Sequence, residues 1–325
     1  MKLIDCQSHI FSPDYMELLK QNTGYIGVEH INEDRYQVCF GTDQRLGIRL
    51  SDYSVEKKIA DMDASGVDIS IVGPNIPGPE LLDEHLRVPA ARLINDFTLA
   101  SCTQYPDRLA GLAVLPFTTI EETLVEYERV IPAGLKGVLL FSHLGERQVD
   151  DKEFEALYQH LEQDGIPIVI HPTVPLWAPQ IKDHFMIPMM GFMVDHSFAM
   201  LRIILSGLLE RYPRLKILQP HCGGILPYLL PRIDEQTESK GRGREYITKP
   251  ASEYFKNVYL DIVSPSAEIA KFALNFSGAD RMLFGSDHPW IPIGDMVTVF
   301  KEMKVSKTDA EKIGHINALG LFGLT

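Results

Sequence analysis

A regular alternation of short apolar runs with segments of helical period most constrains how this chain can fold. Eight runs of β-branched or apolar residues recur, each turning polar at its last few positions. The runs read KLIDCQSH, VDISIVGP, LAGLAVLP, KGVLLFSH, PIVIHPT, LKILQPHC, VYLDIVSP and MLFGSDHPW. Strict alternation implies parallel strands joined by crossover helices, and mostly apolar strands imply a sheet covered on both faces. We therefore predict an α/β fold, a (β/α)₈ TIM barrel.

An open, doubly wound sheet is the alternative fold for such a chain. No G-x-G-x-x-G motif follows the first strand, and eight roughly even units fit a closed sheet better. Gly66, Gly134 and Gly165 stand where predicted helices should stop before the next strand. We expect a single domain over residues 1–325.

Two connections are much longer than the others. They span residues 12–53 after the first strand and residues 173–198 after the fifth. Loops of this length are usually functional covers or small subdomains, and both follow strand C-termini, where barrel enzymes keep their active sites. We expect residues 12–53 to be an insertion that covers the site and residues 173–198 to be an active-site loop.

Charge and cysteine content argue against several classes of function. The formal net charge is −13 without a long basic run, so we expect no nucleic-acid partner. The apolar runs are shorter than the roughly 20 residues of a membrane span, so we expect no membrane partner. The four cysteines are scattered without C-x-x-C spacing, and no signal peptide is visible. These features predict reduced thiols and a cytoplasmic location.

Chemically active side chains collect at the predicted strand ends. Taken singly, each has an ordinary explanation: His171 could be a hydrogen-bonded strand end, and Asp287 a helix N-cap. Jointly, His9, His171, His221 and Asp287 end four strands of one barrel and should converge at its mouth. Imidazoles with a carboxylate are the ligand set of a catalytic divalent metal. We expect one such ion, zinc in the first place and manganese as the next choice.

These motifs resemble the amidohydrolase superfamily. The polar-x-His of the first strand, IHPT on the fifth, PHCGG on the sixth and FGSDHPW on the eighth are similar to the branch of aminocarboxymuconate semialdehyde decarboxylase and the γ-resorcylate-type decarboxylases. MDASGVDISIV and LLERYPRLKIL also fit, so the resemblance spans the chain. It implies that His9, His171 and Asp287 are metal ligands and that His221 and Asp287 act as acid or base.

Position 7 departs from the family pattern. Many relatives have histidine or glutamate as the first ligand, whereas this chain has Gln7. An amide oxygen can coordinate a metal, but it is neutral and a weaker donor. Three interpretations remain open: a native site with a weaker metal, a metal-free site as in some lactonase relatives, and a non-catalytic barrel.

The resemblance implies a metal-dependent, non-oxidative decarboxylase of a small aromatic or unsaturated carboxylic acid. Arg49 and Arg232 match arginines that relatives use for an anionic acid, one of them sometimes from a neighbouring subunit, so we expect a homodimer. The aromatic residues that are candidates to wall the pocket are Phe11, Trp177, Phe192 and Trp290. A metal-dependent hydrolase of a lactone or amide, or a hydratase, would use the same residues. A barrel that only binds a small acid or a partner protein is the third alternative.

Overall fold

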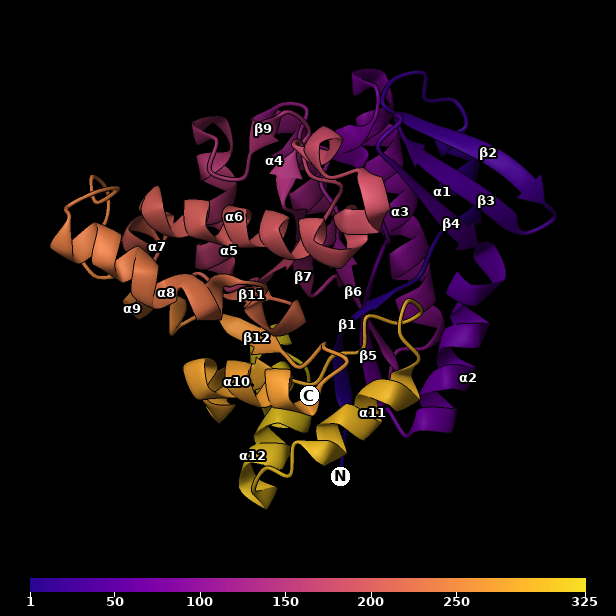
Figure 1. Ribbon diagram of the computed structural model, residues 1–325. Coiled ribbons are helices and arrows are strands. Elements are labelled where there is room, and N and C mark those ends of the chain that lie inside the picture. Colours follow the sequence, from indigo (N-terminus) through magenta and orange to yellow (C-terminus); the bar gives the residue numbers. More distant parts are fainter.

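The computed structural model describes residues 1–325 and confirms the predicted barrel (Figure 1). Eight parallel strands follow one another around the sheet in chain order. They are β1 (Ile4–His9), β5 (Ile69–Gly73), β6 (Leu109–Ala113), β7 (Gly137–Phe141), β10 (Ile168–His171), β11 (Ile217–Gln219), β12 (Tyr259–Asp261) and β13 (Met282–Leu283). The last strand returns to the first: the Cys6 amide donates to the Phe284 carbonyl at 2.9 Å, and the His9 amide donates to the His288 carbonyl at 2.8 Å. These bonds join the two edges of the sheet.

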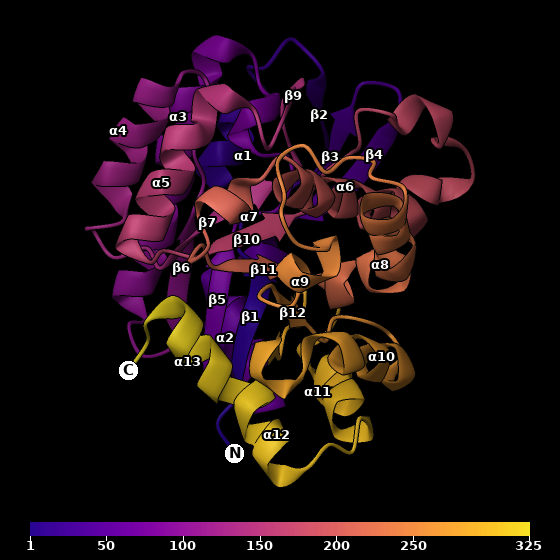
Figure 2. The ribbon, with the colours of Figure 1, turned by 90° about the vertical axis from the view of Figure 1, so that its left-hand side faces the viewer.

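Helices surround the sheet, one or more between each pair of strands (Figure 2). The longer ones are α2 (Val55–Ser65), α3 (Glu84–Gln104), α4 (Ile120–Val130), α5 (Glu155–Asp164), α6 (Phe192–Leu205), α8 (Leu226–Asp234), α10 (Ala267–Ser277) and α11 (Ile293–Glu302). Shorter helices are α7 (Leu208–Arg211), α9 (Ala251–Phe255), α12 (Lys307–Glu311) and α13 (Asn317–Phe322). The predicted helix stops at Gly66 and Gly165 are confirmed, since both glycines cap their helices in the left-handed conformation. Helix α4 ends earlier than expected, and Gly134 lies in the turn that follows it.

Alternate strand residues pack into two different apolar clusters. In β10, Ile168 and Ile170 belong to a cluster of 52 buried residues that includes many helix side chains. Val169 belongs instead to a second cluster, of 35 residues, together with Leu139 of β7. Successive side chains of a strand point to opposite faces, so both faces of this sheet are covered, as the apolar runs predict. The same alternation puts His171, at the end of β10, on the face of Val169.

Residues 12–53 contain a small antiparallel sheet, at the upper right of Figure 1. After helix α1 (Pro13–Leu19), the chain forms β2 (Ile26–Asn32), β3 (Arg35–Phe40) and β4 (Gln44–Arg49). Buried and exposed residues alternate along β4: Leu46 and Ile48 face the protein, whereas Arg45 and Arg49 face solvent. This insertion therefore has one apolar face against the barrel and one polar face.

Residues 173–198 form short 3₁₀ and π turns that lead into α6. By length and composition, Asp183–Leu205 would be long enough to cross a membrane, contrary to the expectation that every apolar run is too short. Half of its apolar 18-residue window is buried inside the protein, and α6 contributes Met200, Ile203 and Ile204 to the larger apolar cluster. This packing accounts for the apolar composition of the segment.

Candidate metal centre and active site

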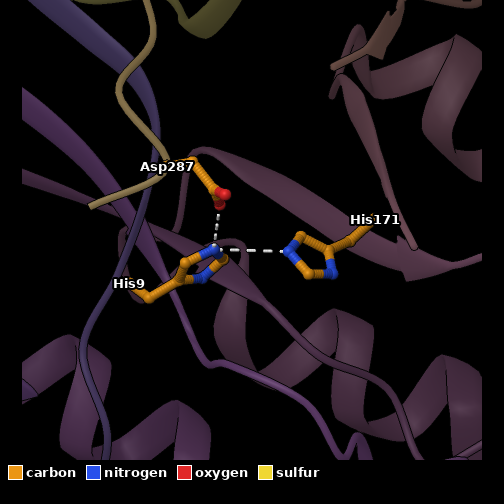
Figure 3. Close-up of side chains that lie close together, drawn as sticks. All are labelled: His9, His171 and Asp287. Carbon is orange, nitrogen blue, oxygen red and sulfur yellow. Dashed lines mark hydrogen bonds and ion pairs between the residues drawn. The ribbon is translucent and has the colours of Figure 1, made fainter. Parts of the chain in front are cut away.

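Three side chains from distant parts of the sequence meet at the carboxyl ends of the barrel strands (Figure 3). His9 ends β1, His171 ends β10, and Asp287 follows β13. The His9 Nε2 atom lies 3.1 Å from Asp287 Oδ1 and 3.3 Å from His171 Nε2. All three possible ligand atoms lie within 4.8 Å of one another. Such a group of nitrogen and oxygen donors has the composition of a divalent metal site.

The histidine rings are held by their other nitrogen atoms. His9 Nδ1 lies 3.0 Å from the Pro74 carbonyl oxygen, and His171 Nδ1 lies 2.7 Å from the Pro172 carbonyl oxygen. Because a carbonyl only accepts, each Nδ1 carries a hydrogen and donates it, so the lone pair of a neutral ring is on Nε2. When both rings are neutral, two lone pairs face each other across 3.3 Å beside a carboxylate, and without a cation only a proton on His9 Nε2 can bridge to Asp287. A bound cation would relieve this repulsion, so the donors fit a metal ion.

Gln7 contacts the same carboxylate. The side-chain NH₂ group of Gln7 donates to Asp287 Oδ1 at 2.9 Å. The side-chain carbonyl oxygen of Gln7, Oε1, is buried without a hydrogen-bond partner. A buried polar atom without a partner is costly, so this oxygen is available to a cation. The strand pairing shifts register between Asp5 and Ser8, and the Asp5 carboxylate instead accepts from Ser70 and Ser286. Of the alternate residues Asp5, Gln7 and His9 in the first strand, only Gln7 and His9 reach the cluster.

Charges around the cluster suit metal binding and proton transfer. Burial lowers the pKa of His171 to about 3, so this ligand is neutral. Burial raises the pKa of Asp287, but His221 and His9 more than offset it and hold that pKa well below its usual value. His221 Nε2 lies 3.6 Å from Asp287 Oδ2, and the acids Asp287 and Asp261 raise the pKa of His221 despite its burial. The site thus combines an ionised carboxylate with an imidazole that retains its proton more readily.

A pocket of about 270 Å³ opens over His171, His221 and Asp287. Its remaining walls are mostly apolar and come from the insertion, the strand ends and the segment 173–198: Leu46, Asn75, Ile76, Pro172, Pro188, Phe192, Met193 and Trp290. No lysine or arginine lines it. The pocket is suited to a small, flat, largely apolar molecule that brings its polar group to the cluster.

Comparison with known proteins identifies the family. Residues 4–324 match the amidohydrolase family model, which is nearly the whole chain. The chain belongs to the amidohydrolase family. This confirms the resemblance that the strand-end motifs carry.

Several relatives of the chain are decarboxylases. γ-Resorcylate decarboxylase from a Rhizobium strain is 27% identical over 95% of each chain. 2-Amino-3-carboxymuconate-6-semialdehyde decarboxylase from Dictyostelium discoideum is 23% identical over 99% of this chain and 91% of its own length. The structure of a dihydroxybenzoic acid decarboxylase from Polaromonas sp. JS666, with bound manganese and the inhibitor 2-nitroresorcinol, has a TM-score of 0.83 and 25% identity over 99% and 97% of the two chains. The chain therefore aligns with these enzymes over nearly their whole length, and it shares its fold with the Polaromonas enzyme.

The other predicted site residues of this amidohydrolase lie at different distances from the pocket. Trp290 lines it, and the Trp290 indole N–H donates to the Asn75 side chain at 3.3 Å. Phe11 is buried and packs on Tyr15 and Tyr53 rather than lining the pocket. Trp177 also lies outside its lining, with its ring 6.5 Å from that of Phe198.

The two predicted arginines do not line the pocket either. Arg49 is exposed at the end of β4 and lines a neighbouring hollow. Arg232 is exposed on α8. Within one chain, the pocket therefore lacks the guanidinium group that the family resemblance predicts for binding an anionic acid.

Lys58 is a buried cation that the sequence analysis missed. It is 1% exposed on α2, and its ammonium group donates to the His288 carbonyl at 3.3 Å. Burial lowers the pKa of Lys58 to about 8, against the opposing charges of Asp5 and Asp61. A lysine in an amphipathic helix normally faces solvent, but Lys58 follows Val55 by three residues and precedes Met62 by four, on the buried face. The spacing of Lys58 from Val55 and Met62 is the sequence feature from which its burial could have been predicted.

Proposed function

We propose that this member of the amidohydrolase family is a metal-dependent, non-oxidative decarboxylase of a small aromatic or unsaturated carboxylic acid. The observation that carries the proposal is the convergence of His9, His171 and Asp287 beneath a small apolar pocket. The decarboxylase activity of the family relatives of similar length supports it.

The metal centre would be formed by His9, His171 and Asp287, with the Gln7 carbonyl oxygen as a neutral fourth donor. When bound, a divalent ion would stabilise the negative charge that builds on the substrate as carbon dioxide leaves. Nitrogen and oxygen donors do not discriminate sharply between zinc and manganese. Zinc is our first proposal, and the manganese in the Polaromonas relative makes that ion the second.

The chain's own residues supply the proton and the enclosure. His221 faces both Asp287 and the pocket, and the nearby acids Asp287 and Asp261 raise its pKa, which favours the protonated ring. It can therefore donate a proton to the carbon that loses the carboxyl group, with Asp287 stabilising its charge. Phe192 and Trp290 line the pocket and offer aromatic surface to a ring, and the apolar walls would exclude water, which strengthens each charge interaction.

We propose that the active form is a homodimer. The pocket contains no lysine or arginine from its own chain, so a second subunit would supply the missing guanidinium, with exposed Arg232 the candidate. The segment 173–198 also exposes Phe185 and Met189 at 72% and 71%. Large exposed apolar side chains commonly mark a protein interface.

Four free cysteines support a reducing, cytoplasmic location as part of this proposal.

Measurement of carbon dioxide release tests the activity. The protein, its metal content determined by elemental analysis, is incubated with hydroxybenzoates and muconate semialdehydes, and in parallel with lactones. We expect carbon dioxide from at least one acid, and loss of both the ion and the activity in His171→Ala. His85→Ala, an exposed histidine on α3, is the matched control and should retain both. Acid release from a lactone without carbon dioxide from any acid would overturn the proposal in favour of a hydrolase.

A further inference from the structure

A second hollow, of about 490 Å³, adjoins the metal pocket. It lies between the insertion sheet and the turn after β13, and Trp290 lines both cavities. The partition between them includes a hydrogen-bonded series: the Asn75 amide donates to the Tyr53 hydroxyl at 2.8 Å, and the Trp290 indole donates to Asn75 at 3.3 Å. A molecule in this hollow is thus one side chain away from the metal pocket.

Two arginines without acidic partners line this hollow. Arg35 of β3 and Arg49 of β4 are directly paired across the antiparallel strands. Both are exposed, and neither guanidinium takes part in a hydrogen bond or ion pair within the chain. Arg45, on the same exposed face of β4, instead lies 3.7 Å from Glu29. The Arg35–Arg49 pair therefore has free donors that suit an anion.

The negative net charge of the protein increases the importance of an arginine pair for binding an anion. The formal net charge is −13, so an anionic acid is repelled by most of the surface. The hollow is lined by Arg35, Arg49 and a single acid, Asp52, which makes it locally positive. A local positive field beside a site raises the rate at which anions are captured.

We propose that the Arg35–Arg49 hollow is an outer binding site for the carboxylate of the acid, occupied before the molecule passes Trp290 into the metal pocket. This inference rests on the proposed function for the identity of the anion as a substrate. Arg35 is then a second substrate-binding arginine beside Arg49. The guanidinium pair binds the carboxylate, and the Trp290 ring offers a surface for the aromatic part.

Trp290 reports on binding directly, because the chain has only two tryptophans. In a Trp177→Phe background, tryptophan fluorescence is titrated with benzoate and with its uncharged analogue benzamide. We expect benzoate to bind more tightly than benzamide, and Arg35→Gln to weaken benzoate about three- to ten-fold while leaving benzamide unchanged. Arg45→Gln removes the same charge from the same exposed face outside the hollow and should have no effect. Asp52→Asn should tighten benzoate binding.

Equal affinity for benzoate in Arg35→Gln and the unsubstituted background would overturn the inference, and so would the absence of any preference for benzoate over benzamide. Failure of the proposed function would give a different result. If no acid releases carbon dioxide but benzoate binding still depends on Arg35, the hollow is an anion site beside an active site that catalyses another reaction. Where an acid is turned over, Arg35→Gln should lower kcat/KM three- to ten-fold with kcat unchanged, and the loss should shrink at high salt.

Discussion

Asp287 and Glu80 are both largely buried carboxylic acids in connections that follow barrel strands, yet their properties are opposite. Asp287 lies among Gln7, His9 and His221, and its pKa is held well below the usual value. Glu80, in the 3₁₀ turn Pro79–Leu81, is 1% exposed, and neither of its carboxyl oxygens has a hydrogen-bond partner. Burial raises the pKa of Glu80 to about 8.

The difference shows that partners, and not depth, decide whether a buried acid is ionised. Desolvation opposes ionisation at both positions. Only at Asp287 do imidazole rings and an amide donor compensate for it. A carboxylate that is already ionised binds a cation without first losing a proton, so we place the proposed metal centre at Asp287 rather than at Glu80. Three substitutions test this comparison.

The largest effect is expected for Asp287→Asn, which keeps the shape and removes the charge. It should abolish stoichiometric metal binding and lower kcat/KM for decarboxylation by at least about 10³-fold, or about 4 kcal/mol. Elemental analysis and carbon dioxide release measure the two effects. Glu80→Gln makes the same chemical change at the other acid and should retain the metal. Full metal content in Asp287→Asn would contradict the assignment of this carboxylate.

Glu80→Gln should change stability with pH. The pKa of Glu80 is raised from 4.5 to about 8, so the folded state retains a proton between these values that the unfolded state has lost. The stability of the native protein should therefore fall as the pH rises from 4.5 to 8, and glutamine removes this penalty. Urea unfolding should show little difference at pH 5 and a gain on the order of 3 kcal/mol at pH 8. A gain of the same size at both pH values would indicate a packing effect instead.

The smallest effect is expected for Gln7→Glu, which adds a charged donor where the chain has a neutral one. Metal affinity should rise about ten-fold, or about 1.4 kcal/mol, in a competition titration against a chelator. Gln219→Glu is the matched control, because Gln219 also ends a barrel strand with a buried, unpartnered carbonyl oxygen. It should lower stability without raising metal affinity. Unchanged affinity in Gln7→Glu would place Gln7 outside the metal's ligands.

The sequence alone determined the barrel, because eight apolar runs in alternation with amphipathic helices can bury their faces in few other ways. It also brought His9, His171 and Asp287 to one rim, since parallel strands present their carboxyl ends together. It predicted no strands within residues 12–53, where the periodic signal of β4 is only a few residues long.

Only the tertiary structure decided which side chains share an environment. Phe11 and Trp177 are aromatic residues near strand ends, as Trp290 is, but only Trp290 lines the pocket. Lys58 was hidden in an ordinary helical pattern, and the free Arg35–Arg49 pair depends on how β3 and β4 pair. Strand order and periodicity are local properties that a sequence displays, whereas ionisation and pocket lining depend on residues far apart in the chain, whose distances are set by packing.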